Sequence, residues 1–270
     1  MDNEKLGSIL PDTLHLKRKN LVIFDLDDTL IHTRMLYNIA YMNAGKALID
    51  AVGTYAPLGS DMIKRVETIN AKLQSVMNYS AERFPLSWVL LYREICSEYN
   101  LPVYEEAVES IRYEASSFQR GPFEVIDGVN NVVSTLDQRP DVDMMILTAG
   151  DFPLQRKKVN EAQLSTYFTE GVNFMIADST KDAILDALVK RNKDNHPLVG
   201  KVIMVGDSLY SDIRPAKKAG AMTIRIPTPG HWAHDDAEVE PDYTISDMTK
   251  LLSVLEHIIP TPNEESCVQK

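Results

Sequence analysis

The sequence is poor in cysteine and contains no long apolar run. Its two cysteines, Cys96 and Cys267, lie in a predicted helix and in a polar carboxyl-terminal segment, which excludes a disulfide framework or a zinc site. The amino-terminal residues lack the basic start and apolar stretch of a signal peptide, and no apolar run approaches the roughly 18 residues of a membrane span. These absences predict a cytoplasmic protein that does not cross a membrane.

Positive charge is also scarce. The chain has 28 Lys and Arg residues against 39 Asp and Glu residues, a formal net charge of −11. This acidic balance argues against a general nucleic-acid binder, and an anionic substrate would need a metal ion or a few placed basic groups. The length of 270 residues and the 44% hydrophobic content favour a globular core domain with a second, smaller domain.

Short apolar runs alternate with helical patterns along most of the chain. The predicted strands are Leu21–Phe24, Val142–Leu147, Val172–Ile176, Val202–Val205, Met222–Ile226 and the weaker Tyr243–Ile245. The predicted helices cover about 128–137, 153–163, 181–191, 210–219 and 246–258. Such alternation is typical of an α/β fold with a doubly wound parallel sheet.

One stretch breaks this alternation. Residues 33–120 contain no convincing strand and at least three helical segments, which predicts an all-helical domain inserted after the first strand. The α/β core would then comprise residues 1–32 and 121–259. Residues 260–270 are polar and rich in proline, which predicts a mobile tail.

The acidic segment Asp25–Thr29 follows the first predicted strand directly. In open α/β sheets the carboxyl ends of the strands are where ligands bind. Two acids separated by one residue can take different roles there. Asp25 can act as a nucleophile, and Asp27 can move a proton. A single pair of acids after a strand is otherwise typical of a turn or a helix cap. Asp28 is expected to lie beside these two acids, on the side that faces solvent.

The second predicted strand ends in small and hydroxyl-bearing residues. Thr148, Ala149 and Gly150 precede a helix that Asp151 can cap. A threonine hydroxyl and the backbone amides at a helix start suit a phosphate group, and the helix dipole adds partial positive charge. We therefore expect Thr148, Ala149 and Gly150 to bind phosphate.

Lys181 stands at the start of the helix that follows the third predicted strand. An ammonium group there would meet the anion that the other groups hold. Lys157 and Lys158 are alternatives for this role, but they lie about two turns into their helix, away from its amino-terminal end.

Two further carboxylates, Asp207 and Asp212, follow the fourth predicted strand. Clustering them with Asp25 would be strongly repulsive without compensation. A hard divalent cation with oxygen ligands removes this repulsion, and Mg²⁺ is the expected ion.

The ordered series Asp25–Thr29, Thr148, Lys181 and Asp207 with Asp212 resembles the motifs of the haloacid dehalogenase superfamily of phosphatases and phosphotransferases. The resemblance covers about residues 20–32 and 121–258. It implies a Rossmann-like core, and it implies that the insert is a helical cap of the C1 type that closes over the active site and helps to choose the substrate.

The resemblance also implies a role for each site residue. Asp25 would attack phosphorus and form an aspartyl-phosphate, while Asp27 would protonate the leaving oxygen and later deprotonate the attacking water. Thr148 and Lys181 would hold the oxygens of the transferred group. Because dehalogenase members lack the second acid, Asp27 favours phosphoryl chemistry over cleavage of a carbon–halogen bond.

The implied Mg²⁺ ligands are a carboxylate oxygen of Asp25, the backbone carbonyl of Asp27, Asp207 and, directly or through water, Asp212. The sequence thus predicts an Mg²⁺-dependent phosphatase that hydrolyses a small-molecule phosphomonoester. Two alternatives are a phosphotransferase or phosphomutase, in which a hydroxyl replaces water, and a non-catalytic phospho-acceptor or scaffold protein. The motifs do not specify the metabolite or the oligomeric state.

Overall fold

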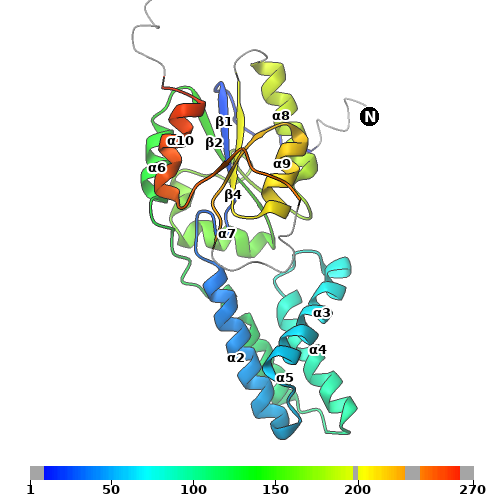
Figure 1. Cartoon of the computed structure of the whole chain (residues 1–270). Coiled ribbons are helices and arrows are strands. Elements are labelled where there is room, and N and C mark those ends of the chain that lie inside the picture. The colour runs from blue at the N-terminus through cyan, green and yellow to red at the C-terminus, as the bar shows by residue number, and fades with distance from the viewer. Residues whose placement is uncertain (1–8, 197–199, 229–237, 262–270) are drawn as a thin grey trace, which may run out of the picture. The chain divides into compact units, whose positions relative to one another are not determined.

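The computed structural model describes residues 9–196, 200–228 and 238–261, which form two compact units (Figure 1). The core unit comprises the described residues of 1–32, 124–149 and 159–270, and the helical unit comprises 33–123 and 150–158. Residues 121–123 and 150–158, which the sequence pattern assigns to the core, therefore group with the helices. Most of the predicted tail, from residue 262 on, lies outside the described residues.

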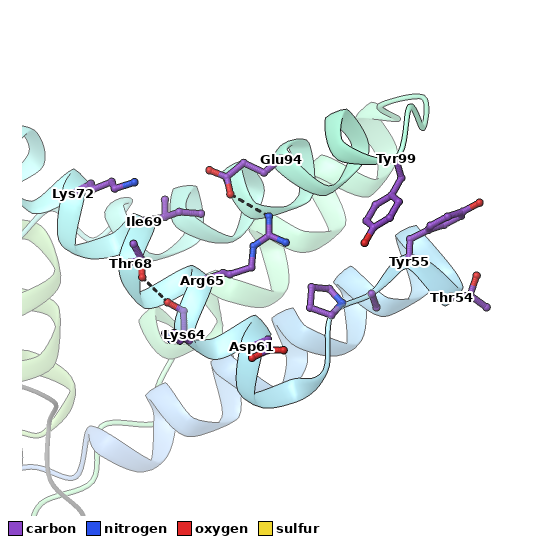
Figure 2. A pocket seen from close by; sticks show the side chains of 12 residues that line it. Thr54, Tyr55, Asp61, Lys64, Arg65, Thr68, Ile69, Lys72, Glu94 and Tyr99 are labelled. Atoms are coloured by element: carbon purple, nitrogen blue, oxygen red, sulfur yellow. Dashed lines mark hydrogen bonds and ion pairs between the residues drawn. The ribbon is translucent and has the colours of Figure 1, made fainter.

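Residues 33–123 of the helical unit form four α-helices and two short 3₁₀ turns. They are α2 (Arg34–Val52), η1 (Gly53–Tyr55), α3 (Gly59–Met77), α4 (Arg83–Glu98), α5 (Glu105–Ala115) and η2 (Ser116–Gln119). Most of α7 (Phe152–Glu161) also belongs to this unit. Arg65 of α3 ties this helix to α4, since its guanidinium lies 3.3 Å from Glu94 (Figure 2) and 2.7 Å from Glu98 of the same helix.

Aromatic side chains fill the interior of the helical unit. Tyr37 stacks on Phe118 with 4.3 Å between ring centroids, and Phe84 packs edge-on against both rings. Trp88, which is 1% exposed, lies edge-on to Phe84. Offset and edge-to-face arrangements of this kind stabilise beyond the burial of area alone.

The core unit contains a parallel sheet of six strands in the order β3-β2-β1-β4-β5-β6. The strands are β1 (Asn20–Phe24), β2 (Val142–Ala149), β3 (Phe174–Ala177), β4 (Val202–Gly206), β5 (Met222–Arg225) and β6 (Tyr243–Thr244). This order confirms the predicted doubly wound α/β fold. It reverses direction between β1 and β4, which is where open sheets of this type bind ligands.

Helices of the core unit cover both faces of the sheet. They are α6 (Val129–Asp137), α8 (Asp182–Asn195), α9 (Arg214–Ala219) and α10 (Leu251–Ile258), and the short turns of this unit are η3 (Leu164–Thr166), η4 (Leu209–Ile213) and η5 (Met248–Lys250). Within the core unit, α8 and α9 lie on one side of the sheet, whereas α6 and α10 lie on the other (Figure 1). Because both faces are covered, all five residues of β1 are buried.

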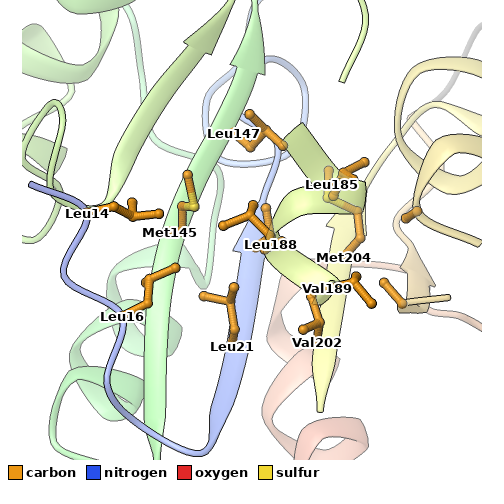
Figure 3. Close-up of a cluster of buried hydrophobic side chains, with 13 residues drawn as sticks. Leu14, Leu16, Leu21, Met145, Leu147, Leu185, Leu188, Val189, Val202 and Met204 are labelled. Carbon is orange, nitrogen blue, oxygen red and sulfur yellow. The ribbon is translucent and has the colours of Figure 1, made fainter. Parts of the chain in front are cut away.

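Side chains that alternate between the two faces of each strand build the hydrophobic core beneath α8. Leu21 of β1 and Met204 of β4 point to the same side of the sheet, where Leu185 and Leu188 of α8 meet them (Figure 3). Ile23 of β1 belongs to the same cluster. Side chains two apart on a strand share a face, as do side chains three apart on a helix. The packing fixes the level at which each strand ends and hence the positions of the groups that follow.

No α-helix in the described ranges is both long and apolar enough to cross a membrane. Even the 19-residue helices α2 and α3 fail this test.

Replacing Leu188 with Ala tests the packing of α8. Leu188 is 1% exposed, so the lost apolar contacts and the resulting cavity should lower the free energy of unfolding by about 2–5 kcal/mol. Leu58→Ala is the matched control, because Leu58 is 77% exposed and its loss should change stability by less than about 0.5 kcal/mol. Urea unfolding followed by circular dichroism measures both, and equal effects would contradict this assignment of the core.

Candidate active site

The carboxyl ends of the parallel strands bring the candidate residues to one edge of the sheet. Phe24, the last residue of β1, pairs with Ile146 of β2 and with Val205 of β4. Asp25 and Asp207 therefore begin the loops that leave two adjacent strands at nearly the same level. Because adjacent strands lie only about 4.8 Å apart, the two carboxylates are neighbours although 182 positions separate them in the sequence.

Lys181 is the centre of the candidate site. Its Nζ donates hydrogen bonds to Oδ1 of Asp25 at 2.5 Å and to Oδ1 of Asp212 at 2.6 Å. All three side chains are nearly inaccessible, with 2%, 9% and 1% of the side-chain surface exposed, respectively. Residues from three separate loops are thus joined by charge-assisted hydrogen bonds, the strong class of such bonds.

Burial and neighbouring charges shift the pKa values of Asp25 and Lys181. Burial raises the pKa of Asp25 from its ordinary 3.8 to about 7; Lys181 opposes the rise, and the charges of Asp212 and Asp27 add to it. Burial alone would lower the pKa of Lys181, but Asp212 and Asp25 outweigh it and raise that pKa above its ordinary value. Lys181 therefore stays protonated and positively charged. Its single charge does not fully offset the repulsion among the neighbouring carboxylates.

Asp25, Asp207 and Asp212 form a set of oxygen donors. One carboxylate oxygen from each lies within 4.8 Å of the other two, and all three residues are buried. The set contains three carboxylates beside the single ammonium group of Lys181, a composition that fits a divalent cation. Carboxylate oxygens are the donors preferred by Mg²⁺ and Ca²⁺.

Asp212 is fixed by a close approach of the backbone. Its Oδ2 accepts a hydrogen bond from the backbone N–H of Ser208 at 3.1 Å, while Oδ1 faces Lys181. A Cβ atom at Gly206 would lie 2.5 Å from the carboxyl group of Asp212. Only glycine at this position leaves room for the carboxylate between the end of β4 and η4.

Two acids of the first motif differ from each other in exposure. Asp27 is half-buried, and its charge contributes to the raised pKa of Asp25. Asp28, which the sequence analysis expects on the solvent side, is instead only 5% exposed, so that expectation is wrong. Its backbone has a left-handed φ of 58°, and its N–H donates to the carbonyl of Ile31 at 2.8 Å. This tight turn folds Asp28 inward.

The predicted phosphate-binding residues fall into both units. Thr148, 1% exposed, is the penultimate residue of β2, and half-buried Ala149 ends the strand. Gly150 belongs to the helical unit. Asp151 caps α7 as expected, since its Oδ1 accepts the N–H of Leu154 at 3.1 Å.

The two alternative lysines have other surroundings. The Nζ of Lys157 donates to the backbone carbonyl of Gln119 at 2.8 Å, and it lies 5.8 Å from the ring centroid of Phe123. Lys158 is buried, at 3% exposed. The geometry favours Lys181 for the lysine role, because Lys181 contacts Asp25 directly.

Arg225 and Thr228 also contact the acidic loops, although the sequence analysis does not select them. Nε of Arg225 donates to the backbone carbonyl of Asp207 at 2.9 Å, and Oγ1 of Thr228 donates to that of Asp28 at 3.2 Å. Each side chain holds a backbone carbonyl of an acidic loop, and neither residue belongs to one of the sequence motifs described above. The sequence feature that could have identified them is their position. Arg225 ends β5 and Thr228 follows it by three residues, at the same edge of the sheet.

Comparison with known proteins agrees with this geometry. A family model of haloacid dehalogenase-like hydrolases matches residues 19–220, which include every residue of the acidic cluster and Lys181. The chain belongs to this family. The predicted resemblance is thereby confirmed.

Several curated members of the family are similar over nearly their whole length. A glyceraldehyde 3-phosphate phosphatase from Pyrococcus furiosus is 28% identical over 243 residues, 89% of this chain and 95% of the relative. A pyrimidine 5′-nucleotidase from Streptococcus pneumoniae is 24% identical over 244 residues, 87% of this chain and 94% of the relative.

Solved structures share the fold. A haloacid dehalogenase-like family hydrolase from Xanthomonas campestris superposes with a TM-score of 0.69 at 21% identity, covering 92% of this chain and 96% of that chain. A 2-haloacid dehalogenase from Pseudomonas syringae gives a TM-score of 0.55 at 21% identity, with 88% and 99% covered. At such identities the likeness concerns the fold alone.

Replacing Gly206 with Ala tests the close approach to Asp212. The added Cβ should push the carboxylate away from Lys181, which lowers the melting temperature and weakens the binding of divalent cations. Gly59→Ala is the matched control, because a Cβ at Gly59 would meet nothing within 4 Å. Calorimetric titration with Mg²⁺ and thermal unfolding measure the two effects. Wild-type cation affinity in the Gly206→Ala protein would contradict the role given to this glycine.

Proposed function

We propose that the protein is an Mg²⁺-dependent phosphatase that hydrolyses a small-molecule phosphomonoester through an aspartyl-phosphate. The observation that carries the proposal is the buried contact of Lys181 with Asp25 and Asp212, beside a third carboxylate from Asp207. Family membership and the phosphatase names of the similar curated proteins support it. None of these relatives identifies the metabolite for this chain.

In the first half-reaction, a carboxylate oxygen of Asp25 attacks the phosphorus atom of the ester. The bond from phosphorus to the ester oxygen breaks as the bond to Asp25 forms, and Asp27 gives its proton to the departing oxygen. Lys181 and the hydroxyl of Thr148 hold the oxygens of the transferred group, where negative charge must be stabilised.

In the second half-reaction, water replaces the alcohol. Asp27, now ionised, takes a proton from the water as its oxygen attacks phosphorus. The bond between phosphorus and Asp25 breaks, which returns the carboxylate and releases inorganic phosphate. The half-buried position of Asp27 suits this role, because a proton carrier must reach both the ester and solvent water.

Mg²⁺ would be held by Asp25, Asp207, the backbone carbonyl of Asp27 and Asp212, the last directly or through water. When bound, it supplies positive charge that offsets the repulsion between a carboxylate nucleophile and a phosphate dianion. Burial and the neighbouring acids raise the pKa of Asp25 against the effect of Lys181, and a bound cation would favour the ionised form that attacks phosphorus. Arg225 holds the backbone carbonyl of Asp207 and so helps to keep this residue in place as a ligand.

We assign the helical unit the role of a cap that selects the substrate. Its position in the sequence, directly after the first motif, supports this role. The substrate class is a small phosphorylated metabolite, and the names of the relatives cover both a triose phosphate and a nucleotide.

Replacing Asp25 with Asn removes the proposed nucleophile. Hydrolysis of a generic substrate such as p-nitrophenyl phosphate should fall by at least about 10⁴-fold, as in other enzymes that lose a covalent nucleophile. Asp186→Asn is the matched control, because Asp186 is an exposed carboxylate of α8 in the same unit and its rate should stay at the wild-type value. An unchanged rate in Asp25→Asn would refute the mechanism.

Metal removal tests the cation site. Excess EDTA should abolish hydrolysis, and added Mg²⁺ should restore it. Asp207→Asn should weaken Mg²⁺ binding measured by calorimetry, since one charged oxygen ligand is lost. Full activity in excess chelator would contradict the proposed dependence on Mg²⁺.

A further inference from the structure

The helical unit contains a pocket of about 630 Å³ that none of the assignments above uses. Its walls come from η1, from one face of α3 and from the second half of α4 (Figure 2). This volume lies within the usual range of small-molecule sites, about 300–1,000 Å³. Every lining residue belongs to the segment 54–99, so the helical unit builds the pocket alone.

One end of the pocket adjoins η1, the short turn that directly follows α2. Helix α2 begins at Arg34 and ends at Val52, immediately before η1. Its 19 residues span roughly 28 Å at 1.5 Å per residue. The pocket thus begins near the end of α2 that lies opposite Arg34, and its lining extends along α3 as far as Lys72.

Two lysines of α3 supply positive charge to the pocket. Lys64, Thr68 and Lys72 are four residues apart and therefore share one face of the helix. Neither Lys64 nor Lys72 forms an ion pair with any residue in the described part of the chain. Arg65 differs, because Glu94 and Glu98 neutralise it. The two ammonium groups therefore remain available to a ligand with negative charge.

Two tyrosines supply a surface for a planar group. The ring centroids of Tyr55 and Tyr99 are 5.0 Å apart with an angle of 41° between the rings. Both side chains line the pocket and are 45% and 51% exposed, respectively. Exposed rigid rings of this kind offer large contact area at little cost in conformational entropy. Ile69, which is 7% exposed, adds an apolar contact.

Asp61 makes the pocket selective. Its carboxylate lies in the first turn of α3, one turn before Lys64, and also lines the pocket. A bare inorganic anion would be repelled at this end. A ligand that carries hydrogen-bond donors apart from its negative charge would satisfy both Asp61 and the lysines.

We propose that this pocket binds an organic anion with a planar ring, whose charged group meets Lys64 and Lys72 and whose ring packs on Tyr55 and Tyr99. The site is additional to the acidic cluster of the core unit and does not depend on the proposed phosphatase activity. A nucleotide combines a planar ring, hydrogen-bond donors and negative charge, so adenosine 5′-diphosphate is a suitable probe.

Calorimetric titration of the Asp25→Asn protein with adenosine 5′-diphosphate tests the proposal, because removal of the proposed nucleophile protects the probe from hydrolysis. Adding Lys64→Gln and Lys72→Gln should weaken binding by about tenfold or more, since two charge-assisted contacts are lost. Tyr99→Ala should weaken it by about tenfold through the loss of ring stacking.

The matched control is Lys46→Gln with Lys250→Gln, which removes the same charge from exposed positions outside the pocket and should leave the affinity within about twofold. Thermal unfolding verifies that each variant is folded. Absence of binding at millimolar probe, or equal binding by pocket and control variants, overturns the proposal. The Lys64→Gln, Lys72→Gln protein with Asp25 intact should hydrolyse phosphate esters normally, which separates this inference from the proposed function.

Discussion

The contact of one lysine with two buried carboxylates governs the chemistry of the core unit. Taking Lys181, Asp25 and Asp212 out of water costs several kcal/mol for each ion, and only excellent geometry repays it. Hydrogen bonds of 2.5 and 2.6 Å provide that geometry. Asp207 adds a third carboxylate within 4.8 Å. These carboxylates outnumber the ammonium group of Lys181, and their oxygen atoms form a donor set that fits a divalent cation.

The parallel sheet is what brings these charges together. Asp25 and Asp207 follow strands that are hydrogen-bonded neighbours, and Lys181 follows a strand two places away. Each loop is then fixed by backbone contacts: Arg225 holds the carbonyl of Asp207, and Gly206 admits the carboxylate of Asp212. The hydrophobic core beneath α8 holds the strands in register. Packing and site geometry are therefore not independent, since a shift of one strand would separate the charges.

The sequence was sufficient to predict the strands of the sheet, because both faces are covered and each strand is therefore a short apolar run. It also predicted the acidic cluster, because Asp25 and Asp207 come at the ends of such runs and Asp212 lies a few residues after Asp207. It did not predict the inward turn of Asp28 or the contacts of Arg225 and Thr228. Those features depend on a left-handed backbone and on side chains that bind backbone carbonyls from a distant segment, and neither leaves a local pattern.

The two units differ in how much change they tolerate. In the core unit, replacing Lys181 would leave buried carboxylates without their ammonium partner, which costs far more than most single substitutions. In the helical unit, the pocket side chains Lys64, Lys72 and Tyr99 are exposed, and exposed positions can change with little loss of stability. The buried charges therefore constrain the geometry of the core site, whereas the side chains of the helical pocket can be replaced with little effect on the fold.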